Sequence, residues 1–352
     1  MSSVYDYRLN KWEEYFLNNG EKKYRARQLY QWLYQKQVTS FQEMSDLSQG
    51  LIAKLAADFS FDDLRLIDKT VSSDETIKYL FELADQALIE TVLMKYDYGN
   101  TVCVTTQVGC NMGCTFCASG LLKKQRDLTA GEMVAQVLYI DKLLKEEDSR
   151  VSNVVVMGIG EPFDNYDNVL DFMKIINHDL GLAIGARHIT VSTSGIVPRI
   201  YDFADEATQF NLAVSLHAAN DELRSKLMPI NQRFNLAALK EALVYYSNKT
   251  NRRITLEYIL LDGVNIADRD VKALKKFVSG LNCYVNLIPY NPVLEVDYHS
   301  VDYRQALEFY NKLKQVNIHC TLRAKQGDDI SAACGQLRAQ QEKGQVNVLR
   351  SK

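Results

Sequence analysis

The stretch Val108-Gly-Cys-Asn-Met-Gly-Cys-Thr-Phe-Cys-Ala-Ser-Gly120 carries three cysteines in the spacing C-x3-C-x2-C. Cys110, Cys114 and Cys117 therefore offer three thiolate ligands from one short loop. A closed tetrahedral zinc site needs four ligands, and a fully ligated 4Fe–4S cluster needs four cysteines. Three ligands leave one iron of such a cluster open, and an open iron can bind a small molecule. Glycines in the loop let the backbone pass close to a cluster.

This spacing resembles the signature of radical S-adenosylmethionine (SAM) enzymes, in which the open iron binds the amino and carboxylate groups of SAM. Cys103 lies just upstream, so a structural zinc knuckle of four cysteines is the alternative interpretation. Zinc sites favour paired C-x2-C hooks, which this spacing does not provide. We therefore expect one 4Fe–4S cluster held by Cys110, Cys114 and Cys117.

Length and composition predict a protein with a large core. The chain has 352 residues, 47% of them hydrophobic, which is enough for one large α/β domain and a smaller one. Its first residues lack the apolar segment of a secretory signal, and no apolar run approaches the length of a membrane span. Seven cysteines without a regular pairing pattern suit a reducing compartment. We expect a cytoplasmic protein with no membrane partner.

The charge balance argues against broad, nonspecific binding of nucleic acid, because the net charge is -3. Local basic patches remain compatible with it. The candidate patches are residues 22–27, 123–126, 224–226 and 252–253. The first patch contains Tyr24 and is followed by Tyr30, which suits phosphate contact combined with base stacking. Ordinary solvated surfaces are the alternative interpretation of each patch.

The first part of the chain predicts a small helical domain. Trp12, Tyr15 and Phe16 share one helical face, and a polar break at residues 18–20 follows them. Further on, residues 77–81 and 87–93 predict a β-hairpin. We expect a small helical domain over residues 1–70, a hairpin linker over 71–98, and the main domain over 99–340.

After residue 100, strands and helices alternate, which predicts a parallel sheet in either a barrel or a doubly wound arrangement. The expected strands are 101–106, 153–157, 188–192, 211–215, 254–259, 285–288 and 320–323. The expected helices include 129–144, 236–246, 271–281 and 303–316. In a barrel, ligands bind at the carboxyl ends of the strands. The cysteine loop follows the first strand there, and the motifs at 158–162, 192–195, 215–217 and 289–291 end later strands.

Short motifs along nearly the whole chain resemble the RlmN/Cfr family of radical SAM RNA methyltransferases. The matching runs are residues 23–27, 32–34, 89–92, 103–117, 157–162, 190–195, 215–218, 228–231, 286–289 and 327–337. The resemblance implies an α/β fold, namely a partial (β/α)6 radical SAM barrel over residues 99–340 with a small N-terminal helical domain. It also implies that the helical domain over residues 1–70 binds RNA and that the barrel domain ends in a catalytic cysteine segment. It also implies SAM and one 4Fe–4S cluster as cofactors.

The resemblance implies a reaction at adenine. Enzymes of the RlmN branch methylate carbon 2 of one adenine in 23S rRNA, at the peptidyl-transferase centre, and some also modify the adenine just 3′ of the tRNA anticodon. The Cfr branch methylates carbon 8 of the same rRNA adenine. Gly-Glu-Pro at 160–162 and Ser-Thr-Ser-Gly at 192–195 match the RlmN branch, where Cfr enzymes tend to carry Gly-Glu-Ala and Ser-Thr-Ile-Gly. The resemblance therefore favours carbon 2, with carbon 8 as the alternative.

Three residues have catalytic roles by this resemblance. Cys334 takes a methyl group from a first SAM and becomes S-methylcysteine. A second SAM is cleaved to a 5′-deoxyadenosyl radical, which removes a hydrogen from that methyl group so that its carbon adds to the adenine. Cys103 then attacks the sulfur of Cys334, which releases the base and leaves a disulfide. Glu90 matches the residue that accepts the proton from carbon 2.

The resemblance also implies the SAM contacts and the partners. Gly160 and Glu161 match a pair that contacts the amino-acid end of SAM. The remaining contact positions are Ser192, Ser215, Leu216, His217 and Asn291. The expected partners are 23S rRNA, tRNA and a reductant such as flavodoxin, and the lack of coiled-coil heptads predicts a monomer. A noncatalytic RNA-binding protein with a structural zinc or cluster is the alternative from another functional class.

Overall fold

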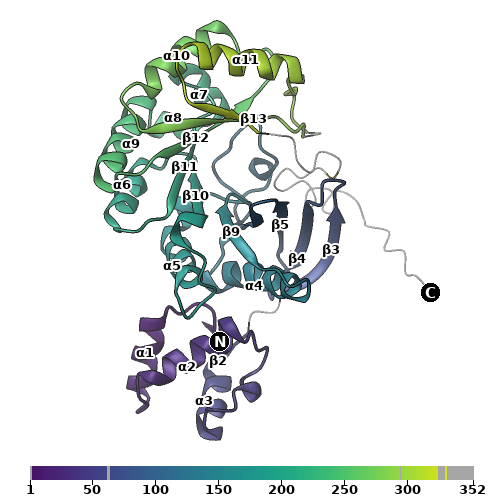
Figure 1. Ribbon diagram of the computed structural model, residues 1–352, viewed down its shortest axis with the longest axis vertical. Helices are drawn as coiled ribbons and strands as arrows, with labels where there is room; N and C mark the ends of the chain where they lie inside the picture. Colours follow the sequence, from purple (N-terminus) through teal and green to yellow (C-terminus); the bar gives the residue numbers. More distant parts are fainter. Residues whose placement is uncertain (1, 62–63, 294, 324–329, 331–352) are drawn as a thin grey trace, which may run out of the picture.

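A computed structural model describes residues 2–61, 64–293, 295–323 and 330 of the chain. Cys334, the methyl carrier implied by the family resemblance, lies outside the described residues. The described chain contains one large curved sheet with helices around its outside and a small helical unit below it (Figure 1). The curvature of the sheet places one of its faces on the inside of the molecule.

The parallel part of the sheet follows the chain strand by strand. Its members are β6 (Gly99–Cys103), β9 (Val151–Val156), β10 (Ile189–Thr193), β11 (Asn211–Ser215), β12 (Ile254–Leu260), β13 (Cys283–Pro289) and β14 (Cys320–Leu322). Each strand is hydrogen-bonded to the next one in this order. A doubly wound sheet reverses its strand order at a switch point, so the sequential order identifies the partial barrel. The predicted fold class is therefore confirmed.

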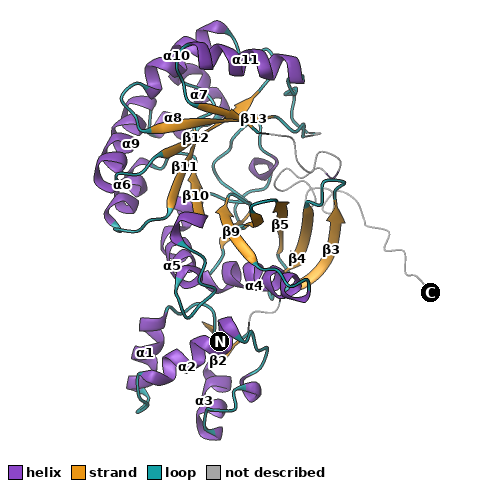
Figure 2. Ribbon diagram, in the orientation of Figure 1, coloured by secondary structure: helices purple, strands orange, loops and turns teal. Residues whose placement is uncertain are grey.

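Helices connect these strands and cover the outer face of the sheet (Figure 2). They are α4 (Ala130–Glu146), α5 (Tyr166–Asn177), α6 (Val197–Asp205), α7 (Asp221–Leu227), α8 (Ile230–Arg233), α9 (Leu236–Thr250), α10 (Asp268–Val278) and α11 (Tyr303–Gln315). Side chains alternate along each strand: Val154 and Val156 are buried in the main core, whereas Asn153 and Val155 line an interior cavity. Among the described residues, no helix combines the length and apolar character needed to cross a membrane.

Three antiparallel strands extend the barrel sheet beyond β6. They are β3 (Arg65–Val71), β4 (Ile77–Glu82) and β5 (Leu88–Tyr96), and β5 pairs directly with β6. The predicted hairpin is present as β4 and β5, but it is a continuous part of the sheet. The sequence did not predict β3, because its residues are mostly exposed and show no alternation of apolar and polar side chains.

The N-terminal helical unit packs around aromatic side chains. It contains β1 (Ser2–Ser3), α1 (Leu9–Asn18), α2 (Tyr24–Tyr30), a π-helical turn (Gln31–Gln35), α3 (Gln49–Asp58) and β2 (Phe59–Ser60). The rings of Trp12 and Phe59 lie 4.6 Å apart at its centre. The unit is held to the barrel by polar contacts, including an ion pair of 2.9 Å between Arg8 and Asp171 on α5.

Candidate active site

The cysteine loop leaves the carboxyl end of β6 and is held by its own backbone. The Cys110 N–H donates to the Leu122 carbonyl oxygen at 2.9 Å, which closes the loop across its base. Gly109 precedes Cys110 with a φ of +77°, and a Cβ at this position would collide with the Lys123 carbonyl oxygen. Only glycine therefore fits at Gly109, and it permits the tight path that presents the cysteines.

Burial keeps the thiols of Cys110 and Cys114 protonated. The pKa of Cys110 is raised to about 11, mainly by burial and with a smaller contribution from Cys117, against the backbone N–H of Met112, which lowers it. The pKa of Cys114 is raised well above its ordinary value, first by burial and then by Cys117 and Cys110. The three thiols thus lie within electrostatic reach of one another. Because iron binds thiolates, cluster binding must displace these protons.

The donor set of this loop fits a three-cysteine cluster in its chemistry. Three thiols come from one loop, and three thiolates leave one iron of a 4Fe–4S cluster open. In the part of the chain that the structure describes, no three His, Cys, Asp or Glu side chains converge closely enough to hold a metal ion. Cys103 lies in β6, outside the cysteine loop, and lines the barrel interior.

An apolar cluster seals the loop against the carboxyl ends of the strands. Its buried members are Phe116, Ala118, Ala218, Leu227, Met228, Leu261, Tyr290 and Val293. The Tyr290 hydroxyl donates to the Phe116 carbonyl oxygen at 3.2 Å, which ties the loop to the segment after β13. The hydroxyls of Thr115 and Tyr298 lie 2.9 Å apart in the same region. Loop and barrel are therefore joined by apolar packing and by polar contacts.

A cavity of about 670 Å³ occupies the inside of the barrel. Cys117 of the cysteine loop and Cys103 at the end of β6 both line it. Cys103 is buried, and its partners in the sheet are Val92 on β5 and Val155 on β9. The structure thus places a cysteine-loop thiol and the predicted attacking thiol on the wall of the same cavity.

Glu90 lies beside Cys103 on the inner face of the sheet. A small cavity of about 10 Å³ is lined by Glu90, Cys103 and Lys78, among others. Glu90 is 4% exposed and Lys78 on β4 is 1% exposed, so both charged groups are withdrawn from water. The Thr105 hydroxyl donates to the Glu90 carbonyl oxygen at 2.5 Å and fixes the backbone there. A carboxylate is therefore held next to the predicted attacking thiol.

The Gly160–Glu161 pair is held rigidly after β9. Gly160 has a φ of +108°, and a Cβ there would lie 2.6 Å from the Gln107 Cβ. One carboxylate oxygen of Glu161 accepts the Phe163 N–H at 3.0 Å, and the other accepts the Ser194 N–H at 2.7 Å. Burial raises the pKa of Glu161, while these backbone donors lower it. Glu161 thereby joins the ends of β9 and β10.

His217 occupies a strained position after β11 and is held neutral. Its φ is +54°, which is uncommon for a residue with a Cβ. Burial, assisted by the positive charge of Arg224, lowers the pKa of His217 to about 3. The Ile259 N–H donates to His217 Nδ1 at 3.1 Å, so Nδ1 is the acceptor and Nε2 carries the proton. His217 therefore presents a neutral N–H donor at Nε2.

The other predicted SAM contacts lie along the same edge of the barrel. Ser192 is on β10, on the same face as Thr190, which lines the cavity. Ser215 ends β11, and Leu216 after it is fully buried. The Asn291 side chain lines the cavity, and its buried Oδ1 accepts no hydrogen bond from the described residues. An unused acceptor of this kind fits a bound ligand that carries a hydrogen-bond donor.

Arg224 organises this edge, although the sequence predicted it only as part of a surface patch. It is fully buried, so the interpretation of residues 224–226 as an exposed basic patch is wrong for Arg224. Its guanidinium donates to the carbonyl oxygens of Ser194, Ser215 and Leu216 at 2.7, 3.1 and 3.2 Å. Burial lowers its pKa to about 10. No sequence motif marked this role.

Glu257 is a second residue that the sequence analysis missed. It lies on β12 between Thr255 and Ile259 on the inner face, and all three line the cavity. Asn286 Nδ2 donates to its Oε2 at 2.8 Å, and the Thr321 hydroxyl donates to the Asn286 side-chain oxygen at 3.1 Å. Burial raises the pKa of Glu257 to about 7, although Asn286 and the charge of Arg323 lower it. The alternation of side chains along a strand, which places Glu257 on the same face as Thr255 and Ile259, was the sequence signal that could have identified this residue.

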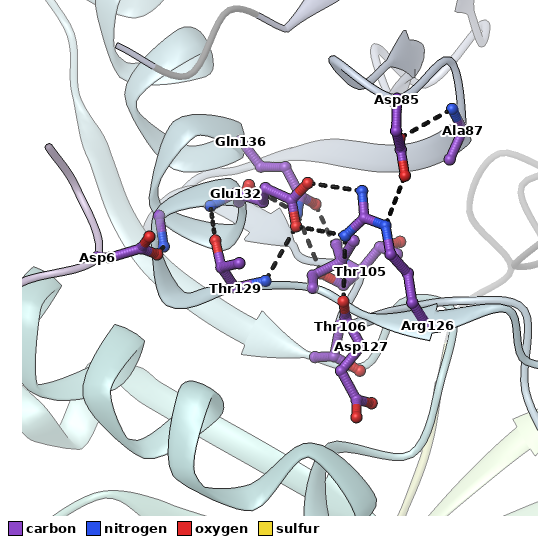
Figure 3. Close-up of polar contacts among 12 residues, drawn as sticks. Asp6, Asp85, Ala87, Thr105, Thr106, Arg126, Asp127, Thr129, Glu132 and Gln136 are labelled. Atoms are coloured by element: carbon purple, nitrogen blue, oxygen red, sulfur yellow. Dashed lines mark hydrogen bonds and ion pairs between the residues drawn. The ribbon is translucent and has the colours of Figure 1, made fainter. Parts of the chain in front are cut away.

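Arg126 anchors the segment between the cysteine loop and α4 (Figure 3). Two of its nitrogens contact the two oxygens of Glu132 at 2.8 and 2.7 Å, and its Nε contacts Asp85 at 2.7 Å. Glu132 also accepts the Thr129 N–H at 2.9 Å, which completes a capping box on α4. Arg126 therefore links the start of α4 to the turn between β4 and β5, which continues into the strand of Glu90.

Two of the predicted basic patches are changed by their surroundings. Lys124 is paired with Asp127 and Asp164, each at 2.8 Å, and Arg126 with two acids as well, so the patch at 123–126 is largely neutralised. In the patch at 22–27, Tyr24 is half exposed, as stacking on RNA requires. Tyr30 is fully buried, however, so the interpretation of Tyr30 as a stacking residue is wrong.

Comparisons with known proteins match the chain over nearly its full length. The model of the radical SAM superfamily matches residues 104–275, and that of the ribosomal RNA large subunit methyltransferase N-terminal domain matches residues 3–60.

A probable dual-specificity RNA methyltransferase RlmN of Staphylococcus carnosus (strain TM300) is 54% identical over 339 residues, or 96% of this chain and 93% of the relative. The protein of the same name in Staphylococcus saprophyticus is 53% identical, over 97% and 94% of the two chains. A radical SAM methyltransferase structure from Sphaerobacter thermophilus superposes with a TM-score of 0.90 at 43% identity and covers 96% of this chain and 99% of that one.

Proposed function

Because the chain belongs to the RlmN family of radical SAM RNA methyltransferases, we propose that it methylates carbon 2 of an adenine in 23S rRNA and of the adenine just 3′ of the tRNA anticodon. The observation that carries this proposal is the shared cavity of Cys103 and Cys117. The thiol of Cys103 must reach a base that reacts next to the cluster-binding loop. Cys103 and Cys117 of that loop line the same cavity, which satisfies this requirement. The matches to the family models and to the curated relatives confirm the resemblance that was seen in the sequence.

Membership of the radical SAM superfamily implies SAM and a 4Fe–4S cluster as cofactors. Cys110, Cys114 and Cys117 would hold the cluster as thiolates. A cluster with an open iron binds SAM and supplies the electron that cleaves it. The amino-acid end of that SAM would meet the Gly160–Glu161 segment, and Asn291 would use its unpartnered oxygen on a donor of the same ligand.

The remaining predicted SAM contacts are assigned by position. Ser192 and Ser215 present hydroxyls at the ends of β10 and β11, next to each other in the sheet. Leu216 supplies an apolar wall, and His217 a neutral N–H donor at Nε2. A neutral donor is suitable beside SAM, because a positive imidazolium would repel the sulfonium of the ligand.

Two cysteines and one carboxylate carry the methyl transfer. Cys334 would receive the methyl group from a first SAM, so that two SAM molecules are used per turnover. Once the methyl carbon is bound to adenine, the Cys103 thiolate attacks the sulfur of Cys334, and the S–S bond forms as the bond between that sulfur and the methyl carbon breaks. The electron pair of the broken bond passes to the methyl carbon and the adenine ring, and the carbon takes up a proton to complete the methyl group. Glu90, held beside Cys103, would accept the proton that leaves carbon 2.

The chemistry sets conditions on the partners and the compartment. A disulfide between Cys103 and Cys334 must be reduced before the next turnover, and cleavage of SAM needs an electron, so we propose a reductant such as flavodoxin. Both requirements favour the reducing cytoplasm. We propose that the protein works as a monomer on its RNA.

Mass spectrometry of digested RNA tests the product directly. Unmodified 23S rRNA and unmodified tRNA would be incubated anaerobically with cluster-loaded protein, SAM and reductant. We expect 2-methyladenosine in both RNAs, and none with the Cys334→Ala variant. 8-Methyladenosine would support the Cfr-like alternative, which differs only in the carbon that is modified. An absence of methylated adenosine, with SAM cleavage intact, would overturn the proposed substrates.

A further inference from the structure

The interior cavity has two ends of different character. Its carboxyl end, where the parallel strands finish, is covered by the packed cysteine loop and the apolar cluster around Phe116. Its amino end, where the strands begin, is lined by side chains that are partly or fully exposed. These residues, called here the amino-end mouth, are Tyr96, Tyr98, Arg187, His188 and Tyr284. They line the same cavity as Cys103, so the mouth is continuous with the predicted reaction centre.

The amino-end mouth contains an aromatic platform. The rings of Tyr96 and Tyr98 are stacked with their centroids 4.7 Å apart and their planes within 11° of parallel. Tyr98 is 71% exposed, in the turn between β5 and β6. Tyr96 therefore supports one face of the Tyr98 ring, which holds the ring in place for a further flat partner. Bases of single-stranded nucleic acid stack on exposed aromatic rings of this kind.

Arginine side chains lie at the amino-end mouth. Arg187 is exposed in the turn before β10, and its Nε donates to Gln209 at 3.2 Å, which leaves the other nitrogens of the guanidinium to contact a ligand. Arg253 lies over the Tyr284 ring at 4.6 Å. Arg323 also lines the cavity, where Glu257 is the acidic side chain among the lining residues. In a chain with a net charge of -3, this is a local concentration of cations.

We propose that the nucleotide to be methylated passes into the barrel through the amino-end mouth, splayed out of a single-stranded or loop segment of RNA. A neighbouring base stacks on Tyr98, and the adjoining phosphate contacts Arg187. The proposal rests on the proposed function and names the path of its substrate. A target base must leave its stack to reach a buried reactive atom, and this mouth leads to Cys103 past the platform. The packed carboxyl end of the barrel offers no comparable path among the described residues.

Binding of RNA, measured without turnover, separates this route from the reaction. Cluster-loaded full-length protein with SAM, but without reductant, would be titrated into a fluorescently labelled RNA stem–loop that contains the target adenine. We expect Tyr98→Ala to weaken binding about 5- to 150-fold, the range for one lost stacking contact. Tyr98→Phe keeps the ring and should bind like the unchanged protein. Tyr303→Ala, at an equally exposed tyrosine on α11, is the matched control and should have no effect.

Salt dependence tests the phosphate contact. Arg187→Ala should reduce the slope of log affinity against log salt concentration by about 0.7, the value for one phosphate contact to a single strand. Arg187→Lys keeps the charge and should restore the slope. A stem–loop with 2-aminopurine next to the target position should show fluorescence quenching on binding that disappears in Tyr98→Ala.

The outcomes separate the route from the reaction. Unchanged affinity, quenching and salt slope in Tyr98→Ala and Arg187→Ala would overturn the route, even if 2-methyladenosine is formed. If the mouth variants lose binding as expected while no RNA is methylated by the unchanged protein, the route stands and the proposed function fails. Equal weakening by Tyr303→Ala would also overturn the route, because the loss would not be specific to the mouth.

Discussion

Arg224 Nη2 donates a hydrogen bond to the Ser194 carbonyl oxygen at 2.7 Å, and this contact ties α7 to the segment after β10. The same guanidinium also donates to the carbonyl oxygens of Ser215 and Leu216, which are themselves two of the predicted SAM contacts. A single buried cation therefore fixes the carboxyl ends of neighbouring strands. Among the described residues, the hydrogen bonds of this guanidinium go to Ser194, Ser215, Leu216 and Asn231 and not to Cys103 or Glu90.

We predict that Arg224→Met destabilises the protein by about 3 kcal/mol or more, because it leaves several buried carbonyl groups without a donor. Arg224→Lys should recover part of this loss, since lysine keeps a charge but lacks the planar fork. Urea unfolding measures the effect. Arg269→Met, at a side chain that is 75% exposed, is the control and should change stability by less than about 0.5 kcal/mol. Equal stability of the two methionine variants would contradict the assigned role of Arg224.

Glu257 should make stability depend on pH. Its pKa is raised from 4.5 to about 7 by burial, so between these values the folded carboxyl keeps a proton that the unfolded chain has lost. Stability must then fall as the pH rises through this window. Glu257→Gln removes the titrating group, and its stability relative to the unchanged protein should rise by on the order of 3 kcal/mol between pH 4.5 and pH 8. Denaturant unfolding across this range measures the difference; a difference that stays constant with pH would show that Glu257 is not shifted.

Gly160 should tolerate no side chain. Gly160→Ala combines a φ of +108° with a Cβ that lies 2.6 Å from another Cβ, so the segment after β9 must move. We predict weakened SAM binding, measured by calorimetry on the cluster-loaded protein, and a loss of about 1–3 kcal/mol in stability. Gly263→Ala is the matched control, because Gly263 also has a positive φ, of +66°, but open space around it. Similar SAM affinity in both variants would contradict the importance of the close packing.

Arg126 and Glu132 should be energetically coupled. Their bidentate contact is partly exposed, with the Arg126 side chain at 32%, so solvent screening limits its strength. We predict a coupling free energy of about 0.5–1 kcal/mol from a double-mutant cycle of Arg126→Met and Glu132→Gln. The coupling should shrink in high salt. The exposed pair of Arg199 and Asp202 provides a comparison cycle with a smaller value, and a zero coupling for Arg126 would contradict its role as an anchor.

Much of the barrel could be predicted from sequence because its strands and helices have strong local signals. The strand at 254–259 alternates apolar and polar residues, and the structure has β12 at Ile254–Leu260. The helix predicted from Thr129 begins with its capping box in place. β3 was missed, because an edge strand with both faces largely exposed lacks the pattern that marks a buried strand.

The site was only partly predictable for a physical reason. The cysteine loop and the residues after β9 and β11 carry motifs that are contiguous in sequence. Arg224 on α7 and Glu257 on β12 contact residues of other elements, so their roles depend on contacts that exist only in the folded chain. Tyr30 shows the opposite error: a tyrosine near a basic run suggested stacking, but it is buried in the core of the helical unit.

The central claim is that Cys103 releases the product from Cys334, and the Cys103→Ala variant tests it most directly. Cluster-loaded variant protein would be incubated with SAM, reductant and the RNA stem–loop, then analysed by denaturing gel and by mass spectrometry of digested protein. If Cys103 is the attacking thiol, the adenine stays bound through the methyl carbon to the sulfur of Cys334, and a covalent protein–RNA adduct accumulates at that residue. Free RNA that contains 2-methyladenosine, released by the variant as fast as by the unchanged protein, would contradict the account.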